Sequence, residues 1–305
     1  MTLVVLLAIG SLAHIYNWIP GDSQPTASST PKVTKPKPPS EPRITVLPKS
    51  VEQGEPAIIV VEGLATTTTV ASFTFAGRPL NFFLYEGSVT AFLGVDLYAA
   101  PGTFPLVLTY KDGRQLQGKF VIEEREPVQR PFDIPEKLGG NTPASIQTLI
   151  TTLAAEGKII NALPTTYKRL WTEPFHAPLD KMVLDDPYGY TRVIGAFTMP
   201  HKGTDFLAEV GTPVYAINKG VVKLATTFRN YGDTVIVDHG VGVHSVYMHL
   251  SKINVAVGET VEKGAVVGLT GETGYTTRPH LHLSVRIWDI SIDPVKFLDL
   301  FGEDN

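Results

Sequence analysis

Residues 280–287 alternate strictly between polar and apolar side chains, and no other segment constrains the fold as strongly. Because successive side chains of a β-strand point to opposite faces, this run predicts a strand with two different faces. One face carries only Leu, Val and Ile and can enter a core. The other carries His280, His282, Ser284 and Arg286. Two imidazoles on one side of a rigid strand can bind a metal ion, or bind one metal and move one proton.

Two further segments carry similar chemistry. His201 and Asp205 lie four residues apart, on what reads as a loop entering a strand, and His249 follows Tyr247 in an apolar run. Each pair alone is more typical of solvated or hydrogen-bonded surface groups. Together with His280 and His282 they indicate a zinc hydrolase site. We assign no site role to the remaining histidines, His14, His176, His239 and His244.

Length and composition limit the classes of protein. A chain of 305 residues is long enough for two domains with separate cores. The net charge of −4 is small, so no nucleic-acid partner is expected. The chain contains no cysteine, which excludes disulfides and thiolate metal sites. Any zinc must therefore be bound by His, Asp or Glu side chains.

The N-terminal region predicts export. Residues 3–9 form an apolar run, followed by a small-x-small pattern at Ser11 and Ala13, so residues 1–19 are interpreted as a signal peptide. A short membrane anchor is the alternative, because no positive charge precedes the run. Residues 20–42 are rich in Pro, Ser, Thr and Lys and predict an extended linker. This organisation indicates an exported protein, periplasmic, extracellular or associated with the cell envelope.

The remaining chain is predicted to be mostly β, in two regions joined by a helical connector. Residues 43–125 contain short β-rich runs, with a hairpin signal at Asp112-Gly113, and predict an immunoglobulin-like β-sandwich. We interpret it as a spacer or a docking module for a protein partner. Residues 126–170 form the connector, in which Thr142-Pro143 begins a helix. Residues 171–305 are again β-rich and glycine-punctuated and form the third region.

Short sequence blocks in this last region resemble, in order, the M23 family of zinc metallopeptidases, the lysostaphin-type or LytM-domain peptidoglycan endopeptidases. Each block alone is weak, but the ordered set is specific. The resemblance implies an antiparallel β metallopeptidase domain with a groove over the metal. The blocks include His201-x-Gly203-x-Asp205, Asp238-His239-Gly240, Tyr247-Met248-His249, Gly271-Glu272-Thr273-Gly274 and Pro279-His280-Leu281-His282.

The resemblance also implies roles for single residues. His201, Asp205 and His282 correspond to the ligands of one zinc ion per chain, with a fourth position open for water. His249 and His280 correspond to the catalytic pair that flanks the metal. One of them takes a proton from the bound water and the other stabilises the oxyanion, and the assignment between them stays open.

Two features beyond this set bear on the substrate. Tyr247 lies one strand repeat before His249, so we expect it to share that face and line the site. Arg278 stands where the family commonly has a glycine, and it either guides an acidic peptide or narrows access. In addition, Leu283-Ser284 replaces the usual aromatic–acid pair after His282.

The resulting interpretation is an exported zinc endopeptidase that cuts peptide cross-links of bacterial peptidoglycan, with D-Ala to diaminopimelate bonds favoured over glycine bridges. The main alternative is a non-hydrolytic peptidoglycan-binding activator of another wall hydrolase. Such proteins usually lack one or more of the five site residues, and all five are present here. A third reading, a carrier or phosphotransfer domain, comes from the hairpin-like residues 257–264. The export signal and the intact histidine set argue against it.

Overall fold

The computed structural model describes residues 41–302, and this part of the chain is mostly β. The expected signal peptide or anchor and nearly all of the expected linker lie outside the described residues. Among the residues that are described, no helix is both long and apolar enough to cross a membrane.

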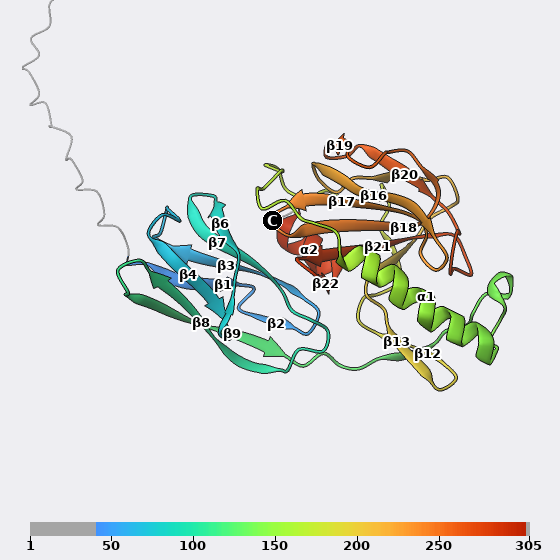
Figure 1. Cartoon of the computed structure of the whole chain (residues 1–305), viewed down its shortest axis with the longest axis horizontal. Helices are drawn as coiled ribbons and strands as arrows, with labels where there is room; N and C mark the ends of the chain where they lie inside the picture. Colours follow the sequence, from blue (N-terminus) through green and yellow to red (C-terminus); the bar gives the residue numbers. More distant parts are fainter. Residues whose placement is uncertain (1–40, 303–305) are drawn as a thin grey trace, which may run out of the picture. The chain divides into compact units, whose positions relative to one another are not determined.

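The N-terminal part of the described chain contains two sheets (Figure 1). The first has the strand order β1 (Arg43–Leu47), β3 (Pro56–Glu62), β7 (Ser88–Gly94) and β6 (Phe82–Tyr85). The second has the order β2 (Ser50–Glu52), β9 (Gln115–Glu123), β8 (Gly102–Tyr110), β4 (Val70–Phe75) and β5 (Arg78–Pro79).

One apolar core holds these two sheets together. Ile59 and Ala91 of the first sheet belong to the same buried cluster as Phe73, Leu106 and Phe120 of the second. The turn expected at Asp112-Gly113 joins β8 to β9, where the Asp112 carboxylate accepts the Arg114 backbone N–H at 3.0 Å. This local hydrogen bond explains why an Asp-Gly pair signals the hairpin.

A helical connector follows. It comprises β10 (Gln129–Pro131), the 3-10 turn η1 (Glu136–Leu138) and helix α1 (Pro143–Asn161). The Thr142 hydroxyl accepts the Ser145 N–H at 3.2 Å, so α1 begins at the N-cap predicted from the sequence. β10 pairs in parallel with β12 (Thr191–Ile194), which forms a hairpin with β13 (Phe197–Pro200).

A ten-stranded sheet forms the C-terminal part (Figure 1). Its main path runs β11 (Val183–Asp186), β14 (Thr204–Leu207), β21 (His280–Ile287), β18 (Val243–Ile253), β17 (Gly232–Gly240), β16 (Gly220–Phe228) and β19 (Thr260–Val261). The strands β15 (Pro213–Tyr215), β20 (Val266–Thr270) and β22 (Ile290–Ile292) pair beside this path. Helix α2 (Pro294–Phe301) closes the chain and is capped by the Asp293 carboxylate.

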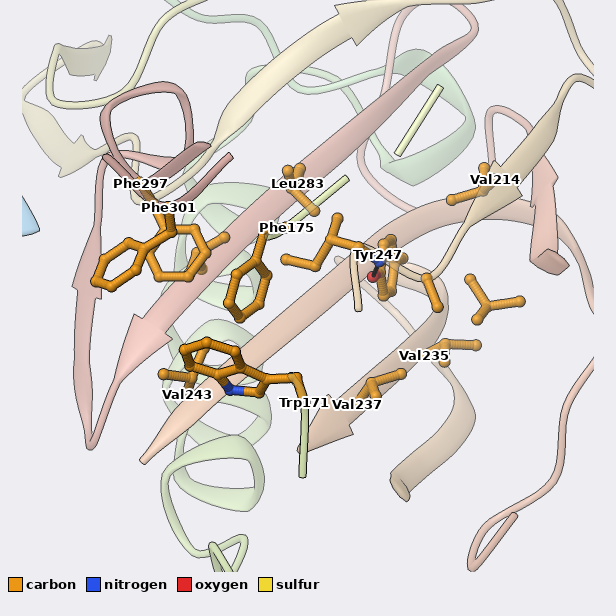
Figure 2. Close-up of a cluster of buried hydrophobic side chains, with 14 of the residues drawn as sticks. Trp171, Phe175, Val214, Val235, Val237, Val243, Tyr247, Leu283, Phe297 and Phe301 are labelled. Carbon is orange, nitrogen blue, oxygen red and sulfur yellow. Dashed lines mark hydrogen bonds between the residues drawn. The ribbon is translucent and has the colours of Figure 1, made fainter. Parts of the chain in front are cut away.

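The sheet has two buried faces of different character. On the first, Leu283 and Val285 of β21 pack with Trp171, Phe175 and the aromatic side chains of α2 (Figure 2). The apolar face predicted for residues 280–287 is therefore confirmed as core. On the second face, Val246 and Met248 of β18 form a smaller cluster with Ile160 of α1. Register pairs Met248 with His282, so α1 covers the face that carries the histidines.

Candidate metal centre

Two neighbouring strands and the loop before one of them bring the predicted ligands together. Asp205 of β14 lies directly opposite His282 of β21 in the antiparallel register. Their atoms Oδ1 and Nδ1 are 2.6 Å apart, although the residues are 77 positions apart in the chain. His201 precedes β14, and its Nε2 lies 3.2 Å from Asp205 Oδ1 and 3.2 Å from His282 Nδ1. All three side chains are buried.

These three atoms fit a zinc ion by chemistry and by spacing. Two imidazole nitrogens and one carboxylate oxygen are ordinary zinc ligands, and three protein ligands leave one position open. Ligands 2.0–2.1 Å from a tetrahedral centre lie about 3.3 Å from each other. Two of the three separations, each 3.2 Å, match this spacing, and the third is shorter at 2.6 Å.

Hydrogen bonds set the tautomers of both ligand imidazoles. The Nδ1–H of His201 donates to the Pro187 carbonyl at 2.9 Å, which leaves its Nε2 lone pair free. The Nε2–H of His282 donates to the Ser284 hydroxyl at 3.1 Å, which leaves its Nδ1 lone pair free. The two free lone pairs are on the two nitrogens that converge with Asp205. The Pro187 carbonyl and the Ser284 hydroxyl, which bond the other nitrogen of each ring, therefore orient the two rings for metal binding.

The electrostatics of Asp205 and His282 favour their metal-binding protonation states. Burial by itself raises the pKa of Asp205, but the two neighbouring imidazoles, His201 and His282, outweigh burial and hold that pKa well below its usual range. Burial lowers the pKa of His282 to about 4. At neutral pH the carboxylate is therefore charged and the imidazole neutral. Arg192 adds a partner for the second carboxylate oxygen, with Nη2 2.8 Å from Asp205 Oδ2.

His249 and His280 flank this centre with matching orientations. The Nδ1–H of His249 donates to the Thr273 carbonyl at 2.8 Å, and that of His280 donates to the Arg278 carbonyl at 2.8 Å. Both Nε2 atoms are thus free to exchange protons. The two ring centroids are 4.8 Å apart, and His280 Nε2 lies 3.7 Å from Asp205 Oδ1. Burial, followed by the charge of His280, lowers the pKa of His249 well below its usual value, so it is neutral at pH 7.

Tyr247 does not line the site, and the expectation that it shares the face of His249 is wrong. Its ring is fully buried in the main core, and its hydroxyl accepts the Ile217 N–H at 2.9 Å. The cause is the backbone of His249, whose φ of +61° is left-handed. This conformation breaks the strand alternation, so that His249 turns away from the face of Tyr247 and toward His280.

Arg278 lies beside the site through its backbone, while its guanidinium pairs with Asp185. Arg278 has 56% of its side chain exposed. With Leu207, Glu209 and Pro279 it lines a cavity of about 620 Å³. Its backbone carbonyl, in contrast, orients His280, which is a role that the side-chain type does not reveal.

Sequence reasoning gave no role to several groups that the structure places at the centre. Thr273 and Pro187 contribute only backbone carbonyls, which carry no residue-specific signal. Ser284 was noted as a departure from the family pattern but not as a partner of His282. Arg192 belongs to an ion-pair and hydrogen-bond network that links Asp205 to Tyr190, Asp186 and Arg130.

Helix α1 and the preceding segment enclose the centre from the polar face of the sheet. The four site histidines and Asp205 are each between 1% and 8% exposed. A cavity of about 340 Å³ lies between them and the helix, lined by His201, His282 and Ser284 together with Leu153 and Gly157 of α1. Phe132 stacks on Tyr275 with their ring centroids 6.0 Å apart. The upstream segment is therefore part of the site's surroundings.

The C-terminal sheet thus carries a buried His-Asp-His set with two histidines beside it, an arrangement suited to a metal-dependent hydrolase. Comparison with known proteins shows that residues 199–294 match peptidase family M23, so the resemblance read from the sequence is confirmed over this segment. Over 97 residues the chain is 40% identical to the peptidoglycan DD-endopeptidase ShyA of Vibrio cholerae, covering 32% of this chain and 23% of that protein. Over 108 residues it is 43% identical to the glycyl-glycine endopeptidase ALE-1 of Staphylococcus capitis, covering 33% of this chain and 30% of that protein.

A solved structure extends the likeness beyond the matched domain. The crystal structure of a candidate M23 peptidase from Pseudomonas aeruginosa is 26% identical to this chain, with a TM-score of 0.60. The alignment covers 82% of this chain and 95% of the other. The two curated relatives, by contrast, are matched over less than a third of their own lengths. Their names therefore bear on the C-terminal domain alone.

Proposed function

We propose that this protein is a zinc-dependent endopeptidase that hydrolyses peptide cross-links of bacterial peptidoglycan. The observation that carries the proposal is the convergence of His201 Nε2, Asp205 Oδ1 and His282 Nδ1, with two further imidazoles whose Nε2 atoms are free. The two named relatives, a peptidoglycan DD-endopeptidase and a glycyl-glycine endopeptidase, support this class of substrate.

The proposed roles follow from the chemistry of each group. His201, Asp205 and His282 would hold one zinc ion per chain. Such an ion supplies a bound water of lowered pKa and polarises the scissile carbonyl. Of the catalytic pair, one imidazole would accept a proton at its free Nε2 and pass it to the leaving amine, while the other, in its doubly protonated form, would donate its Nε2–H to the developing oxyanion. His249 and His280 are both placed for either task.

Substrate preference is a finer part of the proposal. We place the scissile bond between D-Ala and diaminopimelate, and we assign Arg278 to the approach of an acidic stem peptide. The half-exposed guanidinium beside an open cavity supports this assignment. Digestion of purified cross-linked dimers with either a D-Ala–diaminopimelate or a glycine bridge distinguishes the two bond types. Cleavage of the glycine bridge alone would contradict the assignment.

The proposal also assigns roles to the part of the chain that precedes the peptidase domain. We propose that residues 43–125 form an immunoglobulin-like sandwich that docks a protein partner, residues 126–170 a connector and residues 171–305 the peptidase domain. Two sheets around one core support the sandwich. We also propose export to the periplasm, the cell envelope or the exterior, because peptidoglycan lies there.

The test combines metal content with digestion of purified peptidoglycan for the wild type, His249→Ala and His280→Ala. We expect about one zinc per chain in all three proteins, and a loss of muropeptide release of about 10²–10⁴-fold in each variant. His176→Ala, outside the site, is the matched control and should cleave normally. Zinc binding without cleavage by the wild type would favour the non-hydrolytic activator, and absence of stoichiometric metal would overturn the site.

A further inference from the structure

Ser284 makes a hydrogen-bonded link between a candidate metal ligand and the backbone of a neighbouring loop. It follows His282 by two residues on the same face of β21 and is 5% exposed. Its hydroxyl donates to the Lys202 carbonyl at 2.6 Å and lies 3.1 Å from His282 Nε2. This carbonyl belongs to the residue directly after His201.

The Ser284 hydroxyl has one proton, and this determines which group donates in its hydrogen bond with His282. Because that proton is directed to the Lys202 carbonyl, the Ser284 oxygen can only accept from His282. The imidazole must then carry its proton on Nε2 and present the Nδ1 lone pair to Asp205 and His201. In the opposite tautomer, Nδ1–H would occupy the centre, and Nε2 would face an oxygen with no proton to donate.

The His282 ring has Asp205 and His201 beside its Nδ1, and Ser284 is the polar partner of its Nε2. A Cβ atom at Gly203 would lie 2.2 Å from His282 Nε2, so the imidazole rests directly on the glycine backbone. Any side chain there would displace the ring. The close approach of Gly203 therefore fixes the plane of the ring, and the hydroxyl fixes its protonation.

We propose that Ser284 is a positioning residue that sets the tautomer of His282 for metal binding. The proposal rests on the proposed function, since it takes His282 as a zinc ligand. Second partners of ligand imidazoles raise metal affinity by holding ring and tautomer, and their loss typically costs 10–100-fold. Ser284 does not touch the reacting atoms, and the role proposed for it is exerted through His282.

The experiment measures zinc affinity by chelator competition in the full chain for Ser284→Ala and Ser284→Thr. The threonine keeps the hydroxyl, and its added methyl can extend into the 340 Å³ cavity that Ser284 lines. Ser245→Ala is the matched control, because this buried serine also contacts an imidazole, His239, at 2.8 Å but lies outside the centre. Thermal unfolding verifies that each variant is folded.

We expect Ser284→Ala to bind zinc about 10–100-fold more weakly, and Ser284→Thr and Ser245→Ala to stay within about threefold of the wild type. Recovery of zinc affinity in Ser284→Thr, which restores the hydroxyl, is the readout that a loss of packing alone would not produce. It separates an effect of the hydroxyl from general loosening.

Unchanged zinc affinity in Ser284→Ala, or equal losses in the alanine and threonine variants, would overturn the positioning role. Different results would refute the proposed function. A wild type that binds zinc with the expected Ser284 dependence but releases no muropeptides would refute the endopeptidase alone. A wild type that takes up no zinc would refute both.

Discussion

His249 adopts a left-handed backbone conformation with φ of +61°, which few non-glycine residues do. Two hydrogen bonds hold it there: its N–H donates to the Tyr231 carbonyl at 3.0 Å, and its Nδ1–H donates to the Thr273 carbonyl at 2.8 Å. Such conformations persist where the surroundings stabilise them, often at functional sites. Here the unusual φ is what brings His249 to within 4.8 Å of the ring of His280.

His239 has a structural role that produces a pH-dependent stability. It is fully buried, and its Nδ1–H donates to the Lys219 carbonyl at 2.9 Å. Burial lowers its pKa to about 4 in the folded protein. The unfolded chain, with a histidine pKa of about 6.5, binds the proton first as the pH falls. Stability from this group is therefore complete above about pH 6.5 and declines toward pH 4.

We expect this decline to amount to about 3 kcal/mol of unfolding free energy between pH 6.5 and 4, since one pKa unit corresponds to about 1.4 kcal/mol. Urea unfolding of zinc-loaded wild type and His239→Gln at several pH values measures it. The difference between the two slopes isolates His239 from the other histidines. Parallel slopes would show that His239 does not titrate in this window.

Several polar contacts within apolar packing hold helix α1 to the C-terminal part, and Glu156 makes buried ones. Glu156 is 6% exposed and accepts both the backbone N–H and the side-chain amide of Asn230, each at 3.0 Å. Leu149 and Ile160 are the buried apolar residues of the helix. A buried carboxylate is stable only when its hydrogen bonds are made, so Glu156 specifies where the helix docks.

Glu156→Ala should lower the unfolding free energy by about 1–3 kcal/mol, because it leaves the buried backbone N–H of Asn230 without an acceptor, while the Asn230 side-chain amide keeps Thr152 as a partner. Amide hydrogen exchange should accelerate in residues 143–161 and stay slow in β18. Gln147→Ala, at an exposed position of the same helix, is the control and should change stability by less than about 0.5 kcal/mol. Equal effects of the two substitutions would contradict a specific docking contact.

At the scale of the whole described chain, one apolar cluster spans both β-rich parts. Ile58 and Phe92 of the N-terminal sheets belong to the cluster that contains Trp171 and Phe301. The ring of Phe92 lies 4.7 Å from that of Phe301 and stacks 6.1 Å from that of Trp171. Shared burial of this kind couples the unfolding of the two parts.

Phe92→Ala should cost about 3–5 kcal/mol, as for other large-to-small core substitutions. We also expect the wild type to unfold in one calorimetric transition and Phe92→Ala in two, because the substitution weakens the shared cluster. Phe73→Ala removes a ring from the N-terminal core only and should destabilise that part without releasing the interface. A single transition in Phe92→Ala would indicate that other contacts provide the coupling.

Local sequence patterns predicted those features of the fold that depend on residues close together in the chain. The alternation of residues 280–287 predicts a strand with one apolar face, and Thr142-Pro143 predicts the start of α1; both are confirmed. The donor types needed for zinc, and the order of the M23 blocks, are likewise properties of the sequence itself. They are visible because each rests on residues a few positions apart.

Tertiary structure alone decided how these pieces meet. The pairing of β14 with β21 places Asp205 opposite His282, and the left-handed backbone of His249 reverses the face that alternation assigns to it. Ser284 became a partner of His282 because a loop carbonyl takes its proton. Each of these depends on contacts between residues far apart in the chain. Strand periodicity contains no information about such contacts.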